Sequence, residues 1–252
     1  MVTLKERVSG LRDYYTEDAS RYDEDRFGQH KGRLYSEAHY GALRDMIRAG
    51  TVASDNISLR VLDIATGTGR TSVRLADEGF TVCGLDITPE MLYVAHGKKS
   101  AESKLGFCIG DAFSLPFADN SFDVVLCCRM LQMIPREHYD RFGREVSRVI
   151  SPEGILVVEL WNKLYQRFRN PLKRGPNTQG IADTFVEPGE RGGLFGETAQ
   201  PETLRGLGFP LVFCALGGVS EQLSLGLYRR LSANRLTRFF GETMLVQYRN
   251  VK

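Results

Sequence analysis

Apolar and polar positions follow two different periods along this chain. From Leu34 to Gly50 apolar side chains recur at every third or fourth residue, which predicts an amphipathic helix within a helical segment over residues 1–50. Further on, short apolar runs alternate with amphipathic segments of helix length. Strands are expected at 59–64, 80–85, 105–109, 122–128 and 155–160, and helices at 70–78, from 88 onward and at 138–150. This alternation predicts an α/β doubly wound core, with helices on both faces of a parallel sheet.

The regular alternation stops after Trp161. Residues 163–200 are rich in Gly, Pro, Arg and Lys, and we expect them to form a long excursion from the core. The pattern then predicts a short helix at 202–207, a strand at 211–215, a helix near 222–240 and a last strand at 243–248. We therefore divide the chain into a helical segment, 1–50, and a domain over 51–252 with an insertion at about 163–200.

Composition narrows the class of protein. The chain has 252 residues, of which 42% are hydrophobic and 25% charged, as is ordinary for a globular protein. A formal net charge of +2 argues against nucleic acid as the main partner. No apolar run approaches the ~20 residues of a membrane-spanning helix, so we expect no membrane partner. The N-terminal residues carry scattered charges, which does not fit a secretory signal.

The cysteines point to a reducing compartment. Cys83, Cys108, Cys127, Cys128 and Cys214 all lie in apolar, strand-like runs, with no CxxC pair and no Cys/His spacing typical of a metal site. An odd number of cysteines in such contexts is typical of buried, reduced thiols. We therefore expect a cytoplasmic protein without a bound metal.

The turn after the first predicted strand is the main candidate for chemistry. The strand ends in Asp63, and the glycines Gly67 and Gly69 follow before the next helix. Glycines lack a Cβ, so the backbone can turn sharply there and approach a ligand closely. Such short glycine motifs recur by chance, so this turn alone indicates only a nucleotide-like ligand.

Further polar residues fall where later strands end. Ligands of open α/β sheets bind beyond the carboxyl ends of the strands. Asp86 ends the second strand, where a carboxylate can accept hydrogen bonds from both ribose hydroxyls. Asp111 follows the third strand and can accept from an adenine amino group, and Cys128 ends the fourth. Each acid alone could be a helix cap or a solvated loop residue, but together they predict one adenosine lying across adjacent strand ends.

Two details separate a sulfonium ligand from a dinucleotide. The dinucleotide fingerprint G-x-G-x-x-G/A favours a small residue at its last position, where this chain has Ser72. Asp63, just before the glycines, would repel a pyrophosphate. It would instead suit the sulfonium and ammonium groups of S-adenosylmethionine.

These residues resemble the class I S-adenosylmethionine-dependent methyltransferases of the small-molecule type. VLDIATGTGR is similar to the first motif of that family, although Ala65 stands where its first glycine usually falls, and GLDIT and GDAFSLPFADNSFDVVLC resemble the next two. The resemblance implies a Rossmann-like, mostly parallel seven-stranded sheet with an antiparallel C-terminal strand and an N-terminal helical cap. It also implies that residues 207–216 pair with the last strand.

The resemblance assigns the cofactor-binding residues. It implies that Asp63, Ala65, Gly67 and Gly69 line the methionine moiety, Asp86 and Ile87 the ribose and adenine, Asp111 and Ala112 the adenine edge, and that the backbone of Cys128 meets the amino group. In the cap, Tyr22 is a candidate contact to the methionine end, and a packed aromatic residue is the alternative. Arg33 could pair with the cofactor carboxylate or be solvated.

The sequence leaves the catalytic residues unknown. Methyl transfer from a sulfonium is an in-line displacement, so the protein mainly aligns the reactants and excludes water. Family members often carry a histidine just after the fourth strand, where this chain has Met133. His30 and His138 are the remaining candidates for a general base, and each also fits a surface or packing role.

The acceptor is the widest open question. Five basic residues, Lys163, Arg167, Arg169, Lys173 and Arg174, follow the fifth strand and could recognise a polar or anionic metabolite or form a solvated surface. We expect methylation of a small molecule, on oxygen first, with nitrogen and carbon open. The alternatives are a nicotinamide-dependent oxidoreductase and a non-catalytic S-adenosylmethionine-binding partner subunit. The sequence does not determine the oligomeric state, and a homodimer is compatible with it.

Overall fold

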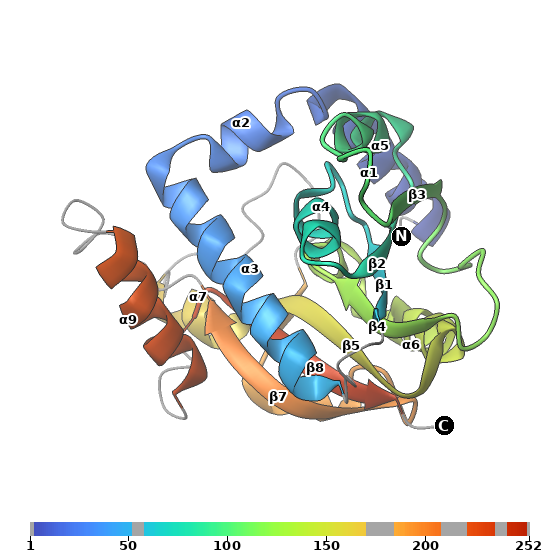
Figure 1. The fold of residues 1–252 in the computed structure, drawn as a ribbon. Helices are drawn as coiled ribbons and strands as arrows, with labels where there is room; N and C mark the ends of the chain where they lie inside the picture. The colour runs from blue at the N-terminus through green and yellow to red at the C-terminus, as the bar shows by residue number, and fades with distance from the viewer. Residues whose placement is uncertain (1–2, 52–57, 170–183, 208–220, 235–240, 251–252) are drawn as a thin grey trace.

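The computed structural model describes residues 3–51, 58–169, 184–207, 221–234 and 241–250 (Figure 1). Its strands are β1 (Arg60–Ile64), β2 (Thr81–Asp86), β3 (Leu105–Ile109), β4 (Phe122–Cys127), β5 (Ile150–Asn162), β6 (Phe185–Val186), β7 (Ala199–Leu207) and β8 (Thr243–Asn250). They form one sheet in the order β3-β2-β1-β4-β5-β8-β7, with the short β6 beside β5. The first five strands are parallel, whereas β8 is antiparallel to both β5 and β7. The predicted sheet of seven main strands with an antiparallel end is confirmed.

Helices cover both faces of this sheet. They are α1 (Leu4–Asp18), α2 (Tyr22–Phe27), α3 (His30–Gly50), α4 (Arg70–Asp77), α5 (Pro89–His96), α6 (Tyr139–Val149), α7 (Lys163–Arg169) and α9 (Glu221–Ala233). In Figure 1 the blue helices α1, α2 and α3 run one after another around the teal helix α4 and the green helix α5, and α9 lies beside α3. The doubly wound arrangement is therefore present.

Alternation along the strands divides the core into two layers. Val125 and Cys127 of β4 pack with Phe142 of α6 on one face, whereas Val124 and Leu126 pack on the other face. Successive side chains of a strand point to opposite faces, so a strand buried on both sides reads as a continuous apolar run. The second layer also contains the buried apolar side chains of α3, including Leu43 and Ile47.

Two local predictions near the C-terminal edge need correction. The short helix predicted at 202–207 is wrong: these residues belong to strand β7. Leu204 pairs with Val246 of β8, and this pairing outweighs the weak local preference of so short a segment. The antiparallel partner of the last strand is thus 199–207 rather than 207–216, and the strand predicted at 211–215 lies outside the described residues.

Strand β5 also begins earlier than the pattern indicates. It starts at Ile150, which pairs with Phe122, and the ladder resumes only where Ile155 pairs with Val124. The segment between them holds the predicted Ser-Pro-Glu-Gly turn, with Glu153 at φ 64°. The turn is therefore an irregularity within the strand rather than its beginning. No described helix is long and apolar enough to cross a membrane.

Candidate functional site

The turn between β1 and α4 has a left-handed backbone at three positions. Ala65, Gly67 and Gly69 have φ values of 57°, 56° and 72°. A Cβ on Gly69 would lie 2.8 Å from the Cβ of Ala95, so both sterics and backbone angle require glycine there. A Cβ on Gly67 would meet nothing within 4 Å. The turn therefore presents Gly67 to open space and packs Gly69 against α5.

Asp63 lies buried beneath this turn. Its Oδ2 accepts hydrogen bonds from the Thr66 hydroxyl at 2.9 Å and from the Ser72 hydroxyl at 2.6 Å. Burial raises the pKa of the Asp63 carboxyl to about 6, and these two hydrogen bonds only partly oppose the rise. Ser72, the residue that departs from the dinucleotide fingerprint, thus helps to hold the acid. A bound cation would favour the charged carboxylate.

Asp86 connects the first turn to the end of β2. Its two carboxylate oxygens accept from the backbone N–H of Gly67 at 2.8 Å and of Thr88 at 2.9 Å. Burial raises the pKa of Asp86, and these N–H donors work against the rise. Each carboxylate oxygen has further acceptor capacity. Asp86 therefore both fixes the loop and stays available to a hydroxyl donor.

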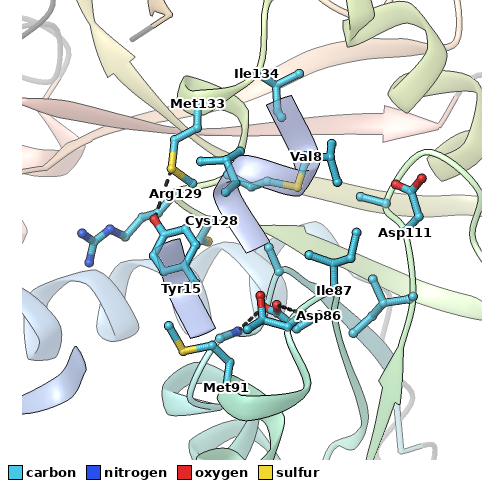
Figure 2. A pocket seen from close by; sticks show the side chains of 18 of the residues that line it. Val8, Tyr15, Asp86, Ile87, Met91, Asp111, Cys128, Arg129, Met133 and Ile134 are labelled. Atoms are coloured by element: carbon cyan, nitrogen blue, oxygen red, sulfur yellow. Dashed lines mark hydrogen bonds between the residues drawn. The ribbon is translucent and has the colours of Figure 1, made fainter. Parts of the chain in front are cut away.

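A cavity opens beside these two turns (Figure 2). It collects eight of the predicted cofactor residues: Tyr22, Ala65, Gly67, Asp86, Ile87, Asp111, Ala112 and Cys128. These residues come from α2 and from the ends of β1, β2, β3 and β4, which the parallel sheet brings to one edge. Asp63 lines the neighbouring cavity instead, and Gly69 lines neither.

The wall of this cavity includes residues that the sequence did not predict as ligands. Leu11 of α1 and Ile134 form an apolar side, and Tyr15 and Met133 close it, with the Tyr15 hydroxyl 3.2 Å from the Met133 sulfur (Figure 2). Aromatic residues in the N-terminal segment were a signal for Tyr15. Nothing in the sequence indicated that α1 crosses to the segment after β4.

A second and a third cavity adjoin the first. The second shares Tyr22, Ala65, Gly67, Cys128 and Arg129 with the first cavity, and it extends to Asp63. The third lies between α2, α3, β5 and β8. Its lining includes the aromatic residues Phe27, Tyr35 and Trp161 and the charged residues Arg129 and Glu159. The site is thus a chain of three connected spaces.

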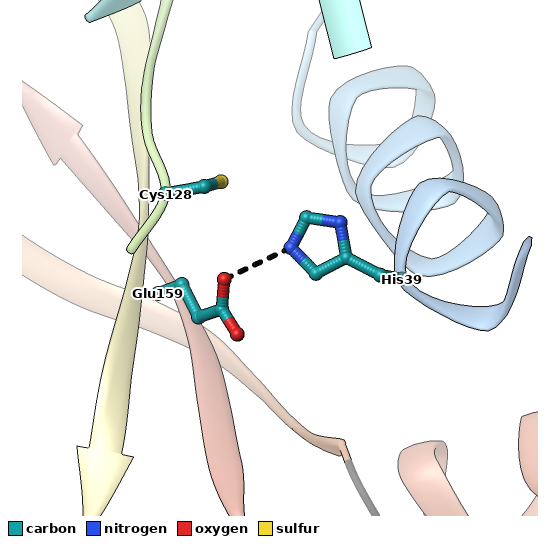
Figure 3. A group of neighbouring side chains, drawn as sticks. All are labelled: His39, Cys128 and Glu159. Carbon is teal, nitrogen blue, oxygen red and sulfur yellow. Dashed lines mark hydrogen bonds and ion pairs between the residues drawn. The ribbon is translucent and has the colours of Figure 1, made fainter. Parts of the chain in front are cut away.

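His39, Cys128 and Glu159 form a compact group between the second and third cavities (Figure 3). Glu159 is fully buried and receives Tyr35 Oη at 2.5 Å and His39 Nε2 at 3.1 Å. Burial alone would raise the pKa of Glu159, but the adjacent His39 brings it down to about 2.

These ligand types suit zinc, and their atoms lie within 4.8 Å of one another. However, Glu159 is already paired, and burial raises the pKa of the Cys128 thiol well above its ordinary value. The group is therefore accounted for as a buried histidine–carboxylate contact beside a protonated thiol. Its members come from three distant segments, and only the fold brings them together.

Other candidates lie away from these cavities. Arg33 is exposed and donates to the carbonyl of Gly28, and His30 is exposed on the first turn of α3. His138 packs edge-on to Phe113, with ring centroids 6.4 Å apart.

Two of the five basic residues after β5 form ion pairs within the described part of the protein, whereas the side chain of Arg169 lies outside that part. Lys163 and Arg167 both pair with Glu187, at 3.4 and 3.1 Å. Lys173 and Arg174 lie outside the described residues. The described cysteines Cys83, Cys108, Cys127 and Cys128 are free, and Cys214 lies outside that part.

Residues 62–158 match the family model described as a methyltransferase domain. The chain is 39% identical over 104 residues to a putative methyltransferase of Bacillus subtilis (strain 168), covering 40% of this chain and 42% of the relative. It is 35% identical over 131 residues to the 2-methyl-6-phytyl-1,4-hydroquinone methyltransferase of a Synechocystis strain, covering 52% and 38%. It is 36% identical over 148 residues to the demethylmenaquinone methyltransferase of Thermus thermophilus, covering 57% and 62%. The chain thus spans between 38% and 62% of the length of these relatives.

Solved structures resemble the whole chain. One is magnesium protoporphyrin IX methyltransferase from Synechocystis PCC 6803 with bound SAH, with a TM-score of 0.68 at 14% identity, covering 96% of this chain and 99% of that one. Another is a putative methyltransferase in complex with the Trm112 methyltransferase activator of Haloferax volcanii, with a TM-score of 0.64 at 20% identity, covering 96% and 98%. At these identities the likeness concerns the fold.

Proposed function

We propose that residues 62–158, which match the methyltransferase domain model, form a class I S-adenosylmethionine-dependent methyltransferase domain, and that the protein transfers a methyl group from S-adenosylmethionine to a small molecule. One observation carries the proposal. A single cavity collects Gly67, Asp86, Asp111 and Cys128 from the ends of four adjacent strands. An adenosine needs this arrangement, because its ribose and adenine must be held at once by groups on neighbouring strands.

The adenosine half would lie against the ends of β2 and β3. Asp86 would accept from the ribose hydroxyls, and Ile87 would pack on the adenine. Asp111 would accept from the adenine amino group, with the N–H of Ala112 beside it. Asp111 already accepts from the N–H of Phe113 at 2.9 Å, which fixes its carboxylate at the mouth of the cavity. Tyr22, from α2, would close the cavity over the methionine end.

The methionine half would pass from the first cavity into the second, beside Gly67. There Asp63 would hold the positively charged ammonium group, and this charge would oppose the burial that raises the pKa of Asp63 in the free protein. S-adenosylmethionine supplies the methyl group and its own leaving group. The chain's residues align the acceptor with the methyl carbon and exclude water.

The acceptor proposal concerns chemical class. Two relatives are named for ring compounds, a hydroquinone and demethylmenaquinone, and neither name specifies an oxygen acceptor. Leu11, Met133 and Ile134 give the first cavity an apolar wall, and Trp161 adds an aromatic surface in the third. We therefore infer an acceptor with an apolar ring. Methylation of an oxygen atom on a polar or anionic metabolite is a more specific proposal. Carbon and nitrogen are the alternative atoms that could receive the methyl group.

Calorimetry with two ligands separates the competing functions. We expect S-adenosylhomocysteine to bind with measurable heat and NAD⁺ to give none. Heat from NAD⁺ alone would instead indicate the nicotinamide-dependent oxidoreductase.

A labelled methyl donor tests turnover. Incubation of the protein with a metabolite extract and labelled S-adenosylmethionine should yield a labelled small molecule, whose analysis identifies the methylated atom. Binding of S-adenosylhomocysteine without a labelled product in any extract would favour the non-catalytic partner subunit. An Asp86→Ala variant serves as the negative control for label transfer.

A further inference from the structure

Arg129 has an unusual backbone at the place where the site is assembled. It is the second residue after β4 and has φ 63°, in the left-handed region that side chains other than glycine rarely adopt. Such residues persist where the surrounding structure fixes them, and they occur preferentially at functional sites. The left-handed turn directs the chain from β4 into the segment that carries Met133.

The side chain of Arg129 lies at the junction of the three cavities. It lines all three of them and is half-buried. In Figure 2 its guanidinium points away from Asp86 and Asp111, toward the side of the site opposite the adenosine residues. Its central carbon is 5.3 Å from the Phe27 ring centroid. The charge is therefore placed beyond the adenosine half, where the cavities meet.

Within the described part of the chain, no carboxylate forms an ion pair with Arg129 and no acceptor receives its N–H groups. Neighbouring arginines differ: Arg26 pairs with Asp18 at 2.6 Å, and Arg70 donates to Ser36 and lies 3.9 Å from Asp23. Glu159 is near enough for Arg129 to lower its pKa, but the two oxygens of Glu159 already bind Tyr35 and His39.

Burial alone would lower the pKa of the Arg129 guanidinium, but nearby groups, Tyr22 and Glu159 among them, raise it, so its charged form is favoured. Because none of these described groups accepts a hydrogen bond from it, its N–H donors stay available to a ligand carboxylate. The planar guanidinium of arginine can donate two parallel hydrogen bonds to the two oxygens of a carboxylate. We propose that Arg129 is the carboxylate anchor of this site. The inference rests on the proposed methyltransferase function, and it gives a role to a residue that was not among the cofactor ligands predicted from the sequence.

The methionine of the donor is the carboxylate that the geometry favours. Arg129 and Gly67 both belong to the wall shared by the first and second cavities, and Asp63 lies in the second. A zwitterionic amino acid in this passage would place its ammonium toward Asp63 and its carboxylate toward Arg129. An acceptor carboxylate entering from the third cavity, which Arg129 also lines, is the other source of the same chemistry.

Two nucleosides distinguish the donor carboxylate from the rest of the cofactor. S-adenosylhomocysteine carries the amino acid, whereas 5′-methylthioadenosine has the same adenosine and sulfur without it. In Arg129→Met we expect the dissociation constant of S-adenosylhomocysteine to rise by about 10- to 100-fold, the usual effect of losing a charged hydrogen bond. For Arg129→Lys this dissociation constant should lie between those of wild type and Arg129→Met, because lysine keeps the positive charge but lacks the two parallel N–H donors of the guanidinium. Binding of 5′-methylthioadenosine should change less than about two-fold.

The control variant is Arg12→Met, which removes an exposed arginine from α1. Thermal unfolding of every variant checks that the fold persists. Equal weakening of S-adenosylhomocysteine and 5′-methylthioadenosine would overturn the carboxylate assignment, because Arg129 would then act on the whole pocket.

Benzoate, a simple ring carboxylate, tests the acceptor as the source. Its binding to the protein, with and without S-adenosylhomocysteine, can be followed by NMR. Unchanged nucleoside affinity together with loss of benzoate binding in Arg129→Met supports an acceptor carboxylate. If the variant changes neither, the proposal is wrong. A wild-type protein that binds neither nucleoside would refute the methyl-donor site itself, and benzoate would then still decide the role of Arg129.

Discussion

At the scale of single residues, two buried carboxylates in the site are held in different ways. Asp86 accepts from two backbone N–H groups, whereas Asp63 accepts from two hydroxyls on a single oxygen. Burial raises the pKa of both, because the charged form loses its hydration. The first arrangement organises the loops that would surround the ribose, and the second keeps a potential negative charge under the turn.

Replacement of Asp86 by asparagine tests the ribose role. The new side chain would turn an amide N–H₂ toward one of the two backbone donors, and the charged acceptor would be lost. We expect the affinity for S-adenosylhomocysteine to fall by about 10- to 100-fold, as for other lost charged hydrogen bonds. Calorimetry measures it, and Asp77→Asn, an exposed position at the end of α4, is the matched control. Equal affinities of the two variants would refute the role.

The titration of Asp63 predicts how cofactor binding depends on pH. In the free protein this carboxyl has a pKa of about 6, and a bound ammonium would lower it. Affinity for S-adenosylhomocysteine should therefore rise from pH 5 to pH 7 by about ten-fold for each unit that the pKa falls, and then level off. Calorimetry below pH 6 in buffers of different ionisation enthalpy should show proton release. Asp63→Asn should remove this pH dependence, and its persistence in that variant would contradict the assignment.

The same group affects stability with the opposite sign. The folded protein holds the Asp63 proton up to about pH 6, whereas the ordinary value for the unfolded chain is 3.8. Between these values the folded state binds more protons, so the free energy of unfolding falls as pH rises. Urea unfolding of the free protein should show this loss in wild type and a smaller one in Asp63→Asn. Equal slopes in the two proteins would count against the raised pKa.

At the scale of elements, the turn between β1 and α4 separates ligand contact from packing. Gly67 faces the cavity and donates its N–H to Asp86, so it links the ends of β1 and β2. Gly69 is the N-cap of α4 and packs on Ala95 of α5. Glycine is therefore required at Gly67 by the expected approach of a ligand and at Gly69 by close packing against Ala95.

Alanine at the two glycines should separate these reasons. Gly67→Ala should lower the free energy of unfolding by about 1–2 kcal/mol through its left-handed backbone alone. Its methyl group would enter open space where the cofactor is expected, so affinity should fall clearly. Gly69→Ala adds a steric conflict of about 1–3 kcal/mol and should be the less stable variant. Urea unfolding and calorimetry measure both effects, and equal stabilities would contradict this distinction.

At the scale of the whole molecule, the N-terminal segment divides into two parts with different roles. The first helices supply Leu11, Tyr15 and Tyr22 to the cavity wall. The third helix instead buries Leu43 and Ile47 among the strand side chains of the second core layer. We therefore propose that α3 is part of the sheet domain and that only α1 and α2 form the cap. A homodimer stays a prediction, which sedimentation would test.

Two truncations test this division. A chain that begins at residue 29 should keep its circular dichroism and unfold cooperatively, but bind S-adenosylhomocysteine at least about ten-fold more weakly, because side chains over the cofactor are lost. A chain that begins at residue 51 should not fold, because one apolar layer would be left uncovered. If the second chain folded and bound the ligand, α3 would belong to the cap after all.

The sequence by itself determined the features that repeat locally. The period of apolar residues predicted the parallel strands and the helices between them, because each strand is buried on both faces. The spacing of Asp63, Asp86 and Asp111 predicted an adenosine site, because parallel strands end at one edge. Local preference failed at β7, a strand defined by its pairing with β8.

Only the tertiary structure decided what lies next to what across long distances in the chain. It placed α1 over the segment after β4, brought His39 and Glu159 together, and paired Lys163 and Arg167 with Glu187. It also put Arg129 where three cavities meet. These relations depend on how helices cross the sheet, and neither periodicity nor motif spacing contains that information, because both describe only neighbours along the chain.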